Sequence, residues 1–202
     1  SALYVQHHSN LRNQDLGFQR RSLLLVTSDT TRSGFPREQL FTPYQQLLGR
    51  LAEIPAVRAV TLSGVTPISG AGASRFIRVE GFEEAPDARR YVPLNWVGPR
   101  YFETFGTPLL GGRDFAFTDK GGPPVAIVNQ ALARYYFGDK DPIGRRFQFV
   151  GSSNSGITDA PPDQAYTIVG VVGDAKYLDL RETPPRTIYL NVFQERSMFA
   201  NE

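Results

Sequence analysis

The sequence predicts an α+β fold in two lobes, and three observations predict it. Short apolar runs typical of strands interleave irregularly with helical patterns, without the regular succession that a doubly wound sheet requires. Glycine and proline account for 19 and 15 of the 202 residues, which favours many turns and short strands. Apolar residues make up 41% of the chain and charged residues 21%, as is typical of a folded protein with a core of its own.

The first third of the chain carries the pattern of a βαβ unit. A short helix is expected at 3–13, and the compact apolar run at 22–29 predicts a buried strand. Apolar residues then follow a helical spacing over 40–51, and Pro55 ends that pattern. The run VRAVTLSGV at 57–65 predicts the second strand of the unit.

The remainder of the chain predicts further strands and two short helices. Gly106 and Gly138 each follow a helical pattern, as glycine commonly does at the C-terminal end of a helix. The paired glycines in LLGGRDF, at 109–115, favour a turn there. The expected strands are 74–82, 91–97, 125–129, 145–150, 166–177 and 187–193, and the expected helices are 98–106 and 130–138.

Charge and cysteine content exclude several classes of function. The formal net charge is only +2, and lysine and arginine are scattered instead of gathered on one arm, which argues against nucleic-acid binding. The chain has no cysteine, so disulfides, thiolate zinc sites and cysteine nucleophiles are excluded. No apolar run approaches the roughly 18 residues that cross a bilayer.

The stretch VNQALARYYFGDKDPIGRRF, at 128–147, holds the strongest candidate for a metal site. Asp139 and Asp141 offer hard oxygen ligands, but a calcium loop needs further carboxylates at fixed spacing and a closing glutamate, which this stretch lacks. A structural interpretation uses more of the residues, because Pro142 fixes φ and Gly144 lets the backbone turn into the next strand. We therefore predict a sharply turned corner, in which a valine at position 144 would be strongly destabilising if the φ of Gly144 is positive.

Other motifs of catalysis and nucleotide binding are incomplete. His7 and His8 are the only histidines, and neighbours on a helix point about 100° apart, which suits them poorly to chelate one metal. The sequence GAGASR at 70–75 begins like a dinucleotide-binding loop, but Arg75 replaces the third glycine and a strand follows where a helix is required. The polar segment GSSNSG at 151–156 does not match the nucleophile elbow of hydrolases.

The remaining acidic pairs are interpreted as solvated surface. These pairs are Glu83 with Glu84, and Glu103 with Asp114. Trp96 falls at a core position of an expected strand, so packing is its expected role. The sequence thus offers no residue that we assign to catalysis, to cofactor binding or to metal binding.

Four segments, in the same order and with similar spacing, resemble the periplasmic core domain of MacB-type ABC transporter permeases. The resemblance is strongest to orphan permeases that lack a fused ATPase, and it covers nearly the whole chain. The four segments are 47–70, 97–115, 124–147 and 166–192. The resemblance implies a non-catalytic extracytoplasmic domain of a bacterial inner-membrane protein, inserted between the first and second transmembrane helices.

The resemblance also implies an organisation and partners. One membrane-proximal, βαβ-containing lobe would be formed by residues 1–97 and 185–202, and residues 98–184 would form an inserted, distal, mixed α/β lobe. The domain would transmit conformational change in export or mechanotransmission, driven by a separate cytoplasmic ATPase subunit. Its partners would be its own transmembrane helices and either periplasmic proteins or a second copy of the chain, with no cofactor. No initiator methionine opens the chain, in agreement with a piece of a longer protein.

Two other interpretations stay open on the sequence. The first is a free-standing extracytoplasmic solute-binding module, which would require an enclosed cleft with polar and aromatic walls between the lobes. The second is a hydrolase whose activity depends on His7 or His8. Both lack the flanking transmembrane helices that the permease interpretation requires.

Overall fold

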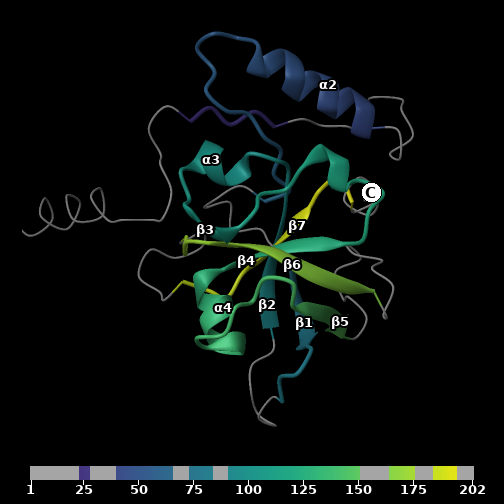
Figure 1. Ribbon diagram of the computed structural model, residues 1–202. Helices are drawn as coiled ribbons and strands as arrows, with labels where there is room; N and C mark the ends of the chain where they lie inside the picture. Colours follow the sequence, from purple (N-terminus) through teal and green to yellow (C-terminus); the bar gives the residue numbers. More distant parts are fainter. Residues whose placement is uncertain are drawn as a thin grey trace, which may run out of the picture.

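In the computed structural model, residues 23–27, 40–65, 73–83, 91–150, 164–175 and 184–194 are described. They form a mixed α/β fold in which three α-helices pack around one seven-stranded sheet (Figure 1). The helices are α2 (Phe41–Ala52), α3 (Tyr101–Phe105) and α4 (Gln130–Phe137), with a 3-10 turn η2 (Phe117–Asp119). The strands are β1 (Ala73–Val79), β2 (Tyr91–Val97), β3 (Leu109–Gly112), β4 (Val125–Asn129), β5 (Arg146–Val150), β6 (Ala165–Val172) and β7 (Ile188–Asn191).

The sheet has the strand order β3-β6-β4-β7-β2-β1-β5, and β5 also pairs with β6. This extra pairing closes the strands other than β3 into a ring of hydrogen-bonded neighbours and leaves β3 attached to β6 alone. The pairs β2–β7 and β4–β6 are parallel, and the other pairs are antiparallel. The last strand, β7, therefore lies in the middle of the sheet.

The position of β7 bears directly on the expected two lobes. β7 pairs on one side with β2, from the expected lobe of 1–97 and 185–202, and on the other side with β4, from the expected lobe of 98–184. β5 of the second lobe also pairs with β1 of the first. Strands of both expected lobes thus join one sheet, and the two-lobe description is not confirmed.

The core lies on both faces of the sheet because side chains alternate along each strand. On β2, Leu94 and Trp96 belong to the larger apolar cluster, whereas Val97 points to a smaller one on the opposite face. Leu132 of α4 and Leu48 of α2 pack in the larger cluster. The smaller cluster is covered by the aromatic side chains of α3, namely Tyr101, Phe102 and Phe105. Burying each such side chain contributes about 1.5–3 kcal/mol to stability.

Most of the expected elements are confirmed with small changes in their bounds. The strands at 91–97 and 125–129 have the predicted limits, and the other predicted strands from 74 onward are each present. The helix expected over 40–51 is α2, and the helix expected over 130–138 is α4. The helix expected at 98–106 begins only after Arg100, so Pro99 precedes it instead of opening it.

The expected βαβ unit is wrong. Residues 23–27 of the apolar run at 22–29 lie outside any strand, and Leu24 and Val26 are 84% and 81% exposed. The run at 57–65 forms only an isolated antiparallel bridge, between Ser63 and Val97. Two strand-like runs therefore flank α2 without entering the sheet as strands.

The turn expected at LLGGRDF is also wrong, because its first four residues form β3. Glycine is needed here for close approach between strands. A Cβ on Gly112 would lie 2.2 Å from the carbonyl oxygen of Val169, and a Cβ on Gly170 would lie 2.5 Å from that of Arg113. Gly112 and Gly170 thus permit the β3–β6 pairing.

The helix expected at 3–13 and both chain ends lie outside the described residues. Within the described ranges, no helix has the length and apolar character needed to cross a membrane.

Candidate functional site

The stretch singled out as a metal candidate forms the corner that the sequence predicts. Gly138 ends α4, with its backbone N–H bonded to the Arg134 carbonyl. One carboxylate oxygen of Asp141 accepts a hydrogen bond from the backbone N–H of Ile143 at 2.9 Å. Gly144 has a φ of 79°, and its N–H donates to the carbonyl of Ile168 at 2.8 Å. These contacts turn the chain from α4 into β5.

The chemistry of a metal centre is not supported by the described part of the chain. It contains no group of three or more histidine, cysteine, aspartate or glutamate side chains placed to hold an ion. The predicted corner is confirmed by its own geometry, namely the hydrogen bond from the Ile143 N–H to Asp141 and the positive φ of Gly144.

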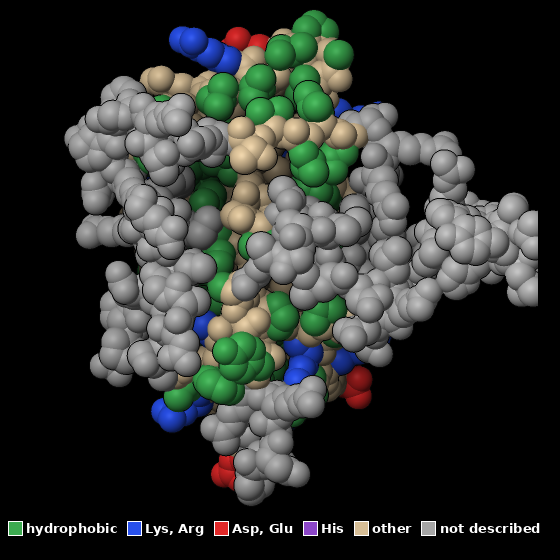
Figure 2. All heavy atoms as spheres, turned by 180° about the vertical axis from the view of Figure 1, so that it is seen from behind, with side chains coloured by type: hydrophobic (Ala, Val, Ile, Leu, Met, Phe, Trp, Pro, Cys, Tyr) green, Lys and Arg blue, Asp and Glu red, His purple; other side chains and the backbone are tan. Residues whose placement is uncertain are grey.

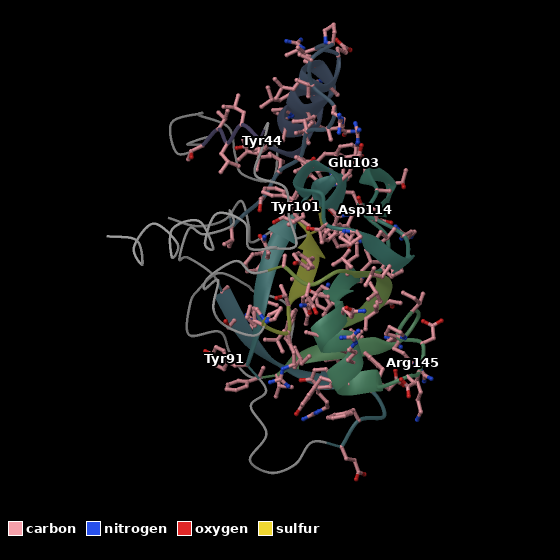
Figure 3. All side chains as sticks on the ribbon, turned by 90° about the vertical axis from the view of Figure 1, so that its left-hand side faces the viewer. Tyr44, Tyr91, Tyr101, Glu103, Asp114 and Arg145 are labelled. Atoms are coloured by element: carbon pink, nitrogen blue, oxygen red, sulfur yellow. The ribbon has the colours of Figure 1, made fainter. Side chains whose placement is uncertain are left out.

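Glu103 and Asp114 both serve the turn between β2 and α3 (Figure 3). Arg100 occupies this turn with a left-handed φ of 64°, and its guanidinium pairs with Glu103 at 2.8 Å. Its backbone N–H donates to Asp114 at 3.1 Å, and its side chain also donates to the Arg58 carbonyl at 2.8 Å. Both carboxylates thus stabilise the left-handed backbone conformation of Arg100.

The pKa values of the two carboxylates are shifted in opposite directions. Hydrogen bonding to Arg100 lowers the pKa of the exposed Glu103. Burial raises the pKa of Asp114, although the backbone N–H groups of Phe115 and Arg100 oppose that effect. The expectation of solvated surface therefore holds for Glu103 and is wrong for Asp114, which is half-buried.

Other sequence candidates lie apart from one another or outside the described residues. Arg75 is buried on β1, with its guanidinium 5.4 Å from the centre of the Phe149 ring, so it belongs to the core and not to a phosphate loop. Glu83 is exposed beside the end of β1. His7, His8, Glu84, residues 70–72 and residues 151–156 lie outside the described ranges.

The densest meeting of distant segments is at one end of the central strands. We call it the end junction and define it as Phe41, Phe117, Lys120, Phe193 and Gln194. The buried ring of Phe193 packs 4.8 Å from the ring of Phe41 and 5.2 Å from that of Phe117. The Lys120 ammonium lies 3.3 Å from the centre of the Phe41 ring. The junction therefore joins α2, η2 and the segment that follows β7.

Gln194 fixes this last segment by hydrogen bonds. Its side-chain oxygen accepts from the N–H of Val125 at 3.1 Å. Its side-chain nitrogen donates to the carbonyls of Asp119 and Pro123, at 2.7 and 3.1 Å. A single side chain thus ties the segment after β7 to the connection between η2 and β4.

The segment after α2 is tied to the same end of the sheet. The N–H of Gly98 donates to the Leu62 carbonyl at 2.9 Å, and the N–H of Gly64 donates to the Trp96 carbonyl at 2.7 Å. These residues lie at the C-terminal end of β2, whose Val97 is the register partner of Asn191 on β7. Because β2 and β7 are parallel, the segments at their C-terminal ends must meet at one edge of the sheet.

The side chain of Asn129 forms a second junction, which we call the Asn129 hub. It joins three segments at the start of α4 by hydrogen bonds. Its side-chain oxygen accepts from the N–H groups of Leu132 and Thr187, at 3.1 and 2.8 Å. Its side-chain nitrogen donates to a carboxylate oxygen of Asp174 and to the Pro185 carbonyl, both at 2.8 Å. The amide is 1% exposed and fully hydrogen-bonded, so its role is structural.

Sequence reasoning missed the end junction. Phe193 was expected only as the end of a strand, and neither Lys120 nor Gln194 was singled out. The junction brings together residues from three distant segments, and no local pattern marks such a contact. Asn129, in contrast, could have been found from the sequence. It lies between a predicted buried strand and a predicted helix, which is the usual position of an asparagine that caps the N-terminus of a helix.

Residues 7–199 match the family model described as the MacB-like periplasmic core domain. The chain belongs to this family, and it is an extracytoplasmic domain of the kind found in ABC transporter permeases of the inner membrane. No curated protein matches the sequence significantly.

Solved structures of related domains resemble the chain at low sequence identity. The periplasmic region of MacB from Actinobacillus actinomycetemcomitans has a TM-score of 0.48 and 16% identity, over 74% of this chain and 55% of that one. The extracellular domain of the noncanonic ABC-type transporter YknZ from Gram-positive bacteria has a TM-score of 0.48 and 17% identity, over 87% and 74%. A domain of a permease protein from Porphyromonas gingivalis, described as putative, has a TM-score of 0.45 and 21% identity, over 71% and 54%. The chain thus spans about half the length of the MacB periplasmic region.

Proposed function

We propose that this domain transmits conformational change across the inner membrane and carries out no catalysis. In this proposal its chain ends continue into transmembrane helices, which move when a separate cytoplasmic ATPase subunit hydrolyses ATP. The family to which the chain belongs supports the setting. The observation that carries the mechanism is the end junction, where α2 and the segment after the last strand, β7, meet at one end of the central strands.

The junction suits the transfer of motion because it is tightly bonded. The Phe193 ring is buried between two other aromatic rings, and Gln194 makes three hydrogen bonds. A packed contact of this kind transmits strain, whereas a loose linker would absorb it. Displacement of the segment after β7 would therefore move β2 and β7 together with α2.

We place the junction end toward the membrane and the 138–145 corner away from it, in line with the expected membrane-proximal and distal parts. α2 lies at this end of the molecule (Figure 1), where Figure 2 shows hydrophobic side chains at the surface. Leu47 on α2 and Ile54 just after this helix are each 45% exposed. Leu24 and Val26 are more exposed still. Exposed apolar surface of this extent favours contact with the protein's own transmembrane helices.

The alternative function is a free-standing solute-binding module. A shallow groove of about 610 Å³ lies beside β1 and β5, lined by Arg78, Glu80 and Arg146 among others. A solute binder would instead need an enclosed cleft, and the described residues form one sheet without separate lobes. The permease proposal accounts for more of the structure.

The proposal is tested in the full-length permease reconstituted with its ATPase in lipid nanodiscs. The domain has no cysteine, so Asp139→Cys introduces one attachment point for a fluorescent donor at the exposed corner, once cysteines elsewhere in the protein are replaced. Energy transfer to acceptor-labelled lipids then reports the distance of the corner from the bilayer. We expect ATP to change the transfer, and a hydrolysis-deficient ATPase to hold it at one value.

Energy transfer that does not change when ATP is added would contradict the proposal. A change produced by a small solute in the absence of ATP, together with a solute-dependent rise in melting temperature, would favour the binding module instead.

A further inference from the structure

A second groove, of about 270 Å³, lies between β3 and α4. Its walls include Leu110 and Gly111 of β3, Val171 of β6, Ala133 and Arg134 of α4, and Ile143 of the corner. It is separate from the end junction, and its floor is mostly apolar. The question is what such a groove would hold.

β3 offers a free edge beside this groove. Among the described residues it pairs with β6 alone, and its register shifts between Leu109 and Gly111. Leu109 and Leu110 are 43% and 49% exposed, and the strand carries no charged side chain and no proline. Natural edge strands usually carry charged residues or proline, because an edge without them pairs readily with another strand.

Gly111 is not explained by the fold of the chain itself. Its φ lies outside the left-handed region, and a Cβ there would meet no atom within 4 Å. Gly112, by contrast, has a φ of 72° and approaches the β6 backbone too closely for a side chain. A glycine inside a strand with open space above it is typical of a place where another backbone approaches.

Two cations lie at the rim of the groove. Arg134 and Lys140 are exposed, and no ion pair with either side chain is found in the described part of the chain. Asp141, the acid on the same rim, already accepts the hydrogen bond from Ile143. The rim therefore favours a ligand that carries a carboxylate.

We propose that this groove binds an extended peptide segment of a partner protein, with alternating apolar residues and a carboxylate. The segment adds to the free edge of β3 by main-chain hydrogen bonds, as in other cases of strand addition. Its apolar side chains enter the groove beside Gly111, and its carboxylate lies near Arg134 and Lys140. The inference stands independently of the proposed function, because it concerns a different surface and does not require ATP.

The test uses the purified domain and fluorescein-labelled hexapeptides. The first peptide is Ser-Val-Thr-Val-Glu-Val with a free C-terminus, the second is its amidated form, and the third is amidated with lysine in place of glutamate. Fluorescence anisotropy measures binding, and NMR chemical-shift changes locate it. Comparing the first two peptides shows whether the terminal or the side-chain carboxylate is recognised.

The matched variants are Gly111→Val and Gly49→Ala. Both glycines have open space around them and no left-handed φ, so both variants should keep the fold, which circular dichroism and melting curves check. We expect saturable binding of a carboxylate peptide, with shifts on β3 and α4. Gly111→Val should weaken it by about tenfold or more, Gly49→Ala should not, and Arg134→Glu should weaken it by about fivefold.

Three results would overturn the inference. One is the absence of saturable binding by both carboxylate peptides at millimolar concentration. Another is binding that Gly111→Val leaves unchanged in a folded protein, or that the lysine peptide shares fully. The third is a dimer in sedimentation that Gly111→Val dissociates while neither carboxylate peptide binds, since the groove would then be an interface between copies of the chain.

Discussion

The ring of Phe193 packs edge-on against the ring of Phe41, with 4.8 Å between the ring centres and an angle of 83° between the planes. This contact joins the segment after the last strand to the first turn of α2. Edge-to-face packing of this kind is worth about 0.5–1.5 kcal/mol beyond the area that it buries. It joins two segments that are about 150 residues apart in the sequence.

Replacing Phe193 by alanine should therefore destabilise the domain strongly. The side chain is 5% exposed, and removing a buried phenylalanine costs about 3–5 kcal/mol. Urea denaturation measures the change in the free energy of unfolding. Leu47→Ala, on the exposed face of α2, is the control and should cost less than about 0.5 kcal/mol. Equal effects of the two variants would mean that Phe193 is not packed as described.

Asn129→Asp should be strongly destabilising although it changes only one atom. The substitution puts a carboxylate oxygen where the amide nitrogen now donates to Asp174 and Pro185. Two carboxylates would then face each other in a buried site, at a cost of about 3 kcal/mol or more. Protonation would relieve the repulsion, so the loss measured by urea denaturation should shrink as the pH falls. Unchanged stability at neutral pH would contradict the assignment of this hub.

The corner interpretation predicts opposite outcomes for neighbouring residues. Gly144→Val should cost about 1–3 kcal/mol because valine does not tolerate a φ of 79°. Asp141→Asn should cost less than about 1 kcal/mol, since asparagine keeps a side-chain oxygen for the hydrogen bond to Ile143. Asp139→Asn should cost equally little, because Asp139 is an exposed turn residue. Calcium should leave the melting temperature unchanged. A clear rise with calcium would restore the metal interpretation.

Asp119 should make the stability of the domain depend on acidic pH. Partial burial raises its pKa, but hydrogen bonds from the Arg113 guanidinium and the Ala116 N–H outweigh this effect and hold it below its ordinary value. Its contribution is then present above the unfolded value of about 4 and is lost as the pH falls through the lower folded value. The difference in unfolding free energy between the wild type and Asp119→Asn should therefore shrink on acidification. A difference that stays constant down to about pH 2 would disprove this.

The elements that the sequence predicted best are those with strong local signals. The succession β4, α4 and corner is specified by a buried strand, the N-cap Asn129 and the glycines at 138 and 144. Each of these patterns determines the backbone conformation of only a few neighbouring residues. Contacts with distant parts of the chain therefore change that conformation little. The corner was predicted for the same reason.

The errors concern pairings that depend on distant parts of the chain. The run at 57–65 has a strand-like pattern, but beside it β2 already pairs with β7 along one edge and with β1 along most of the other. Only the end of β2 is left, and a single bridge at Ser63 results. The end junction could not be predicted for a similar reason, because its contacts follow from the parallel pairing of β2 with β7.

The most direct test of the central claim is the ATP-driven change in energy transfer from the Asp139→Cys label when the end junction is weakened. Phe193→Leu combined with Gln194→Ala removes the aromatic contact and three hydrogen bonds while keeping an apolar side chain in the core. Gly49→Ala, which adds a methyl group in open space on α2, serves as the control, and melting curves confirm folding. We predict that the double variant hydrolyses ATP but loses most of the change in transfer, while the control keeps it. A full ATP-driven change in the folded double variant would contradict the claim that motion passes through this junction.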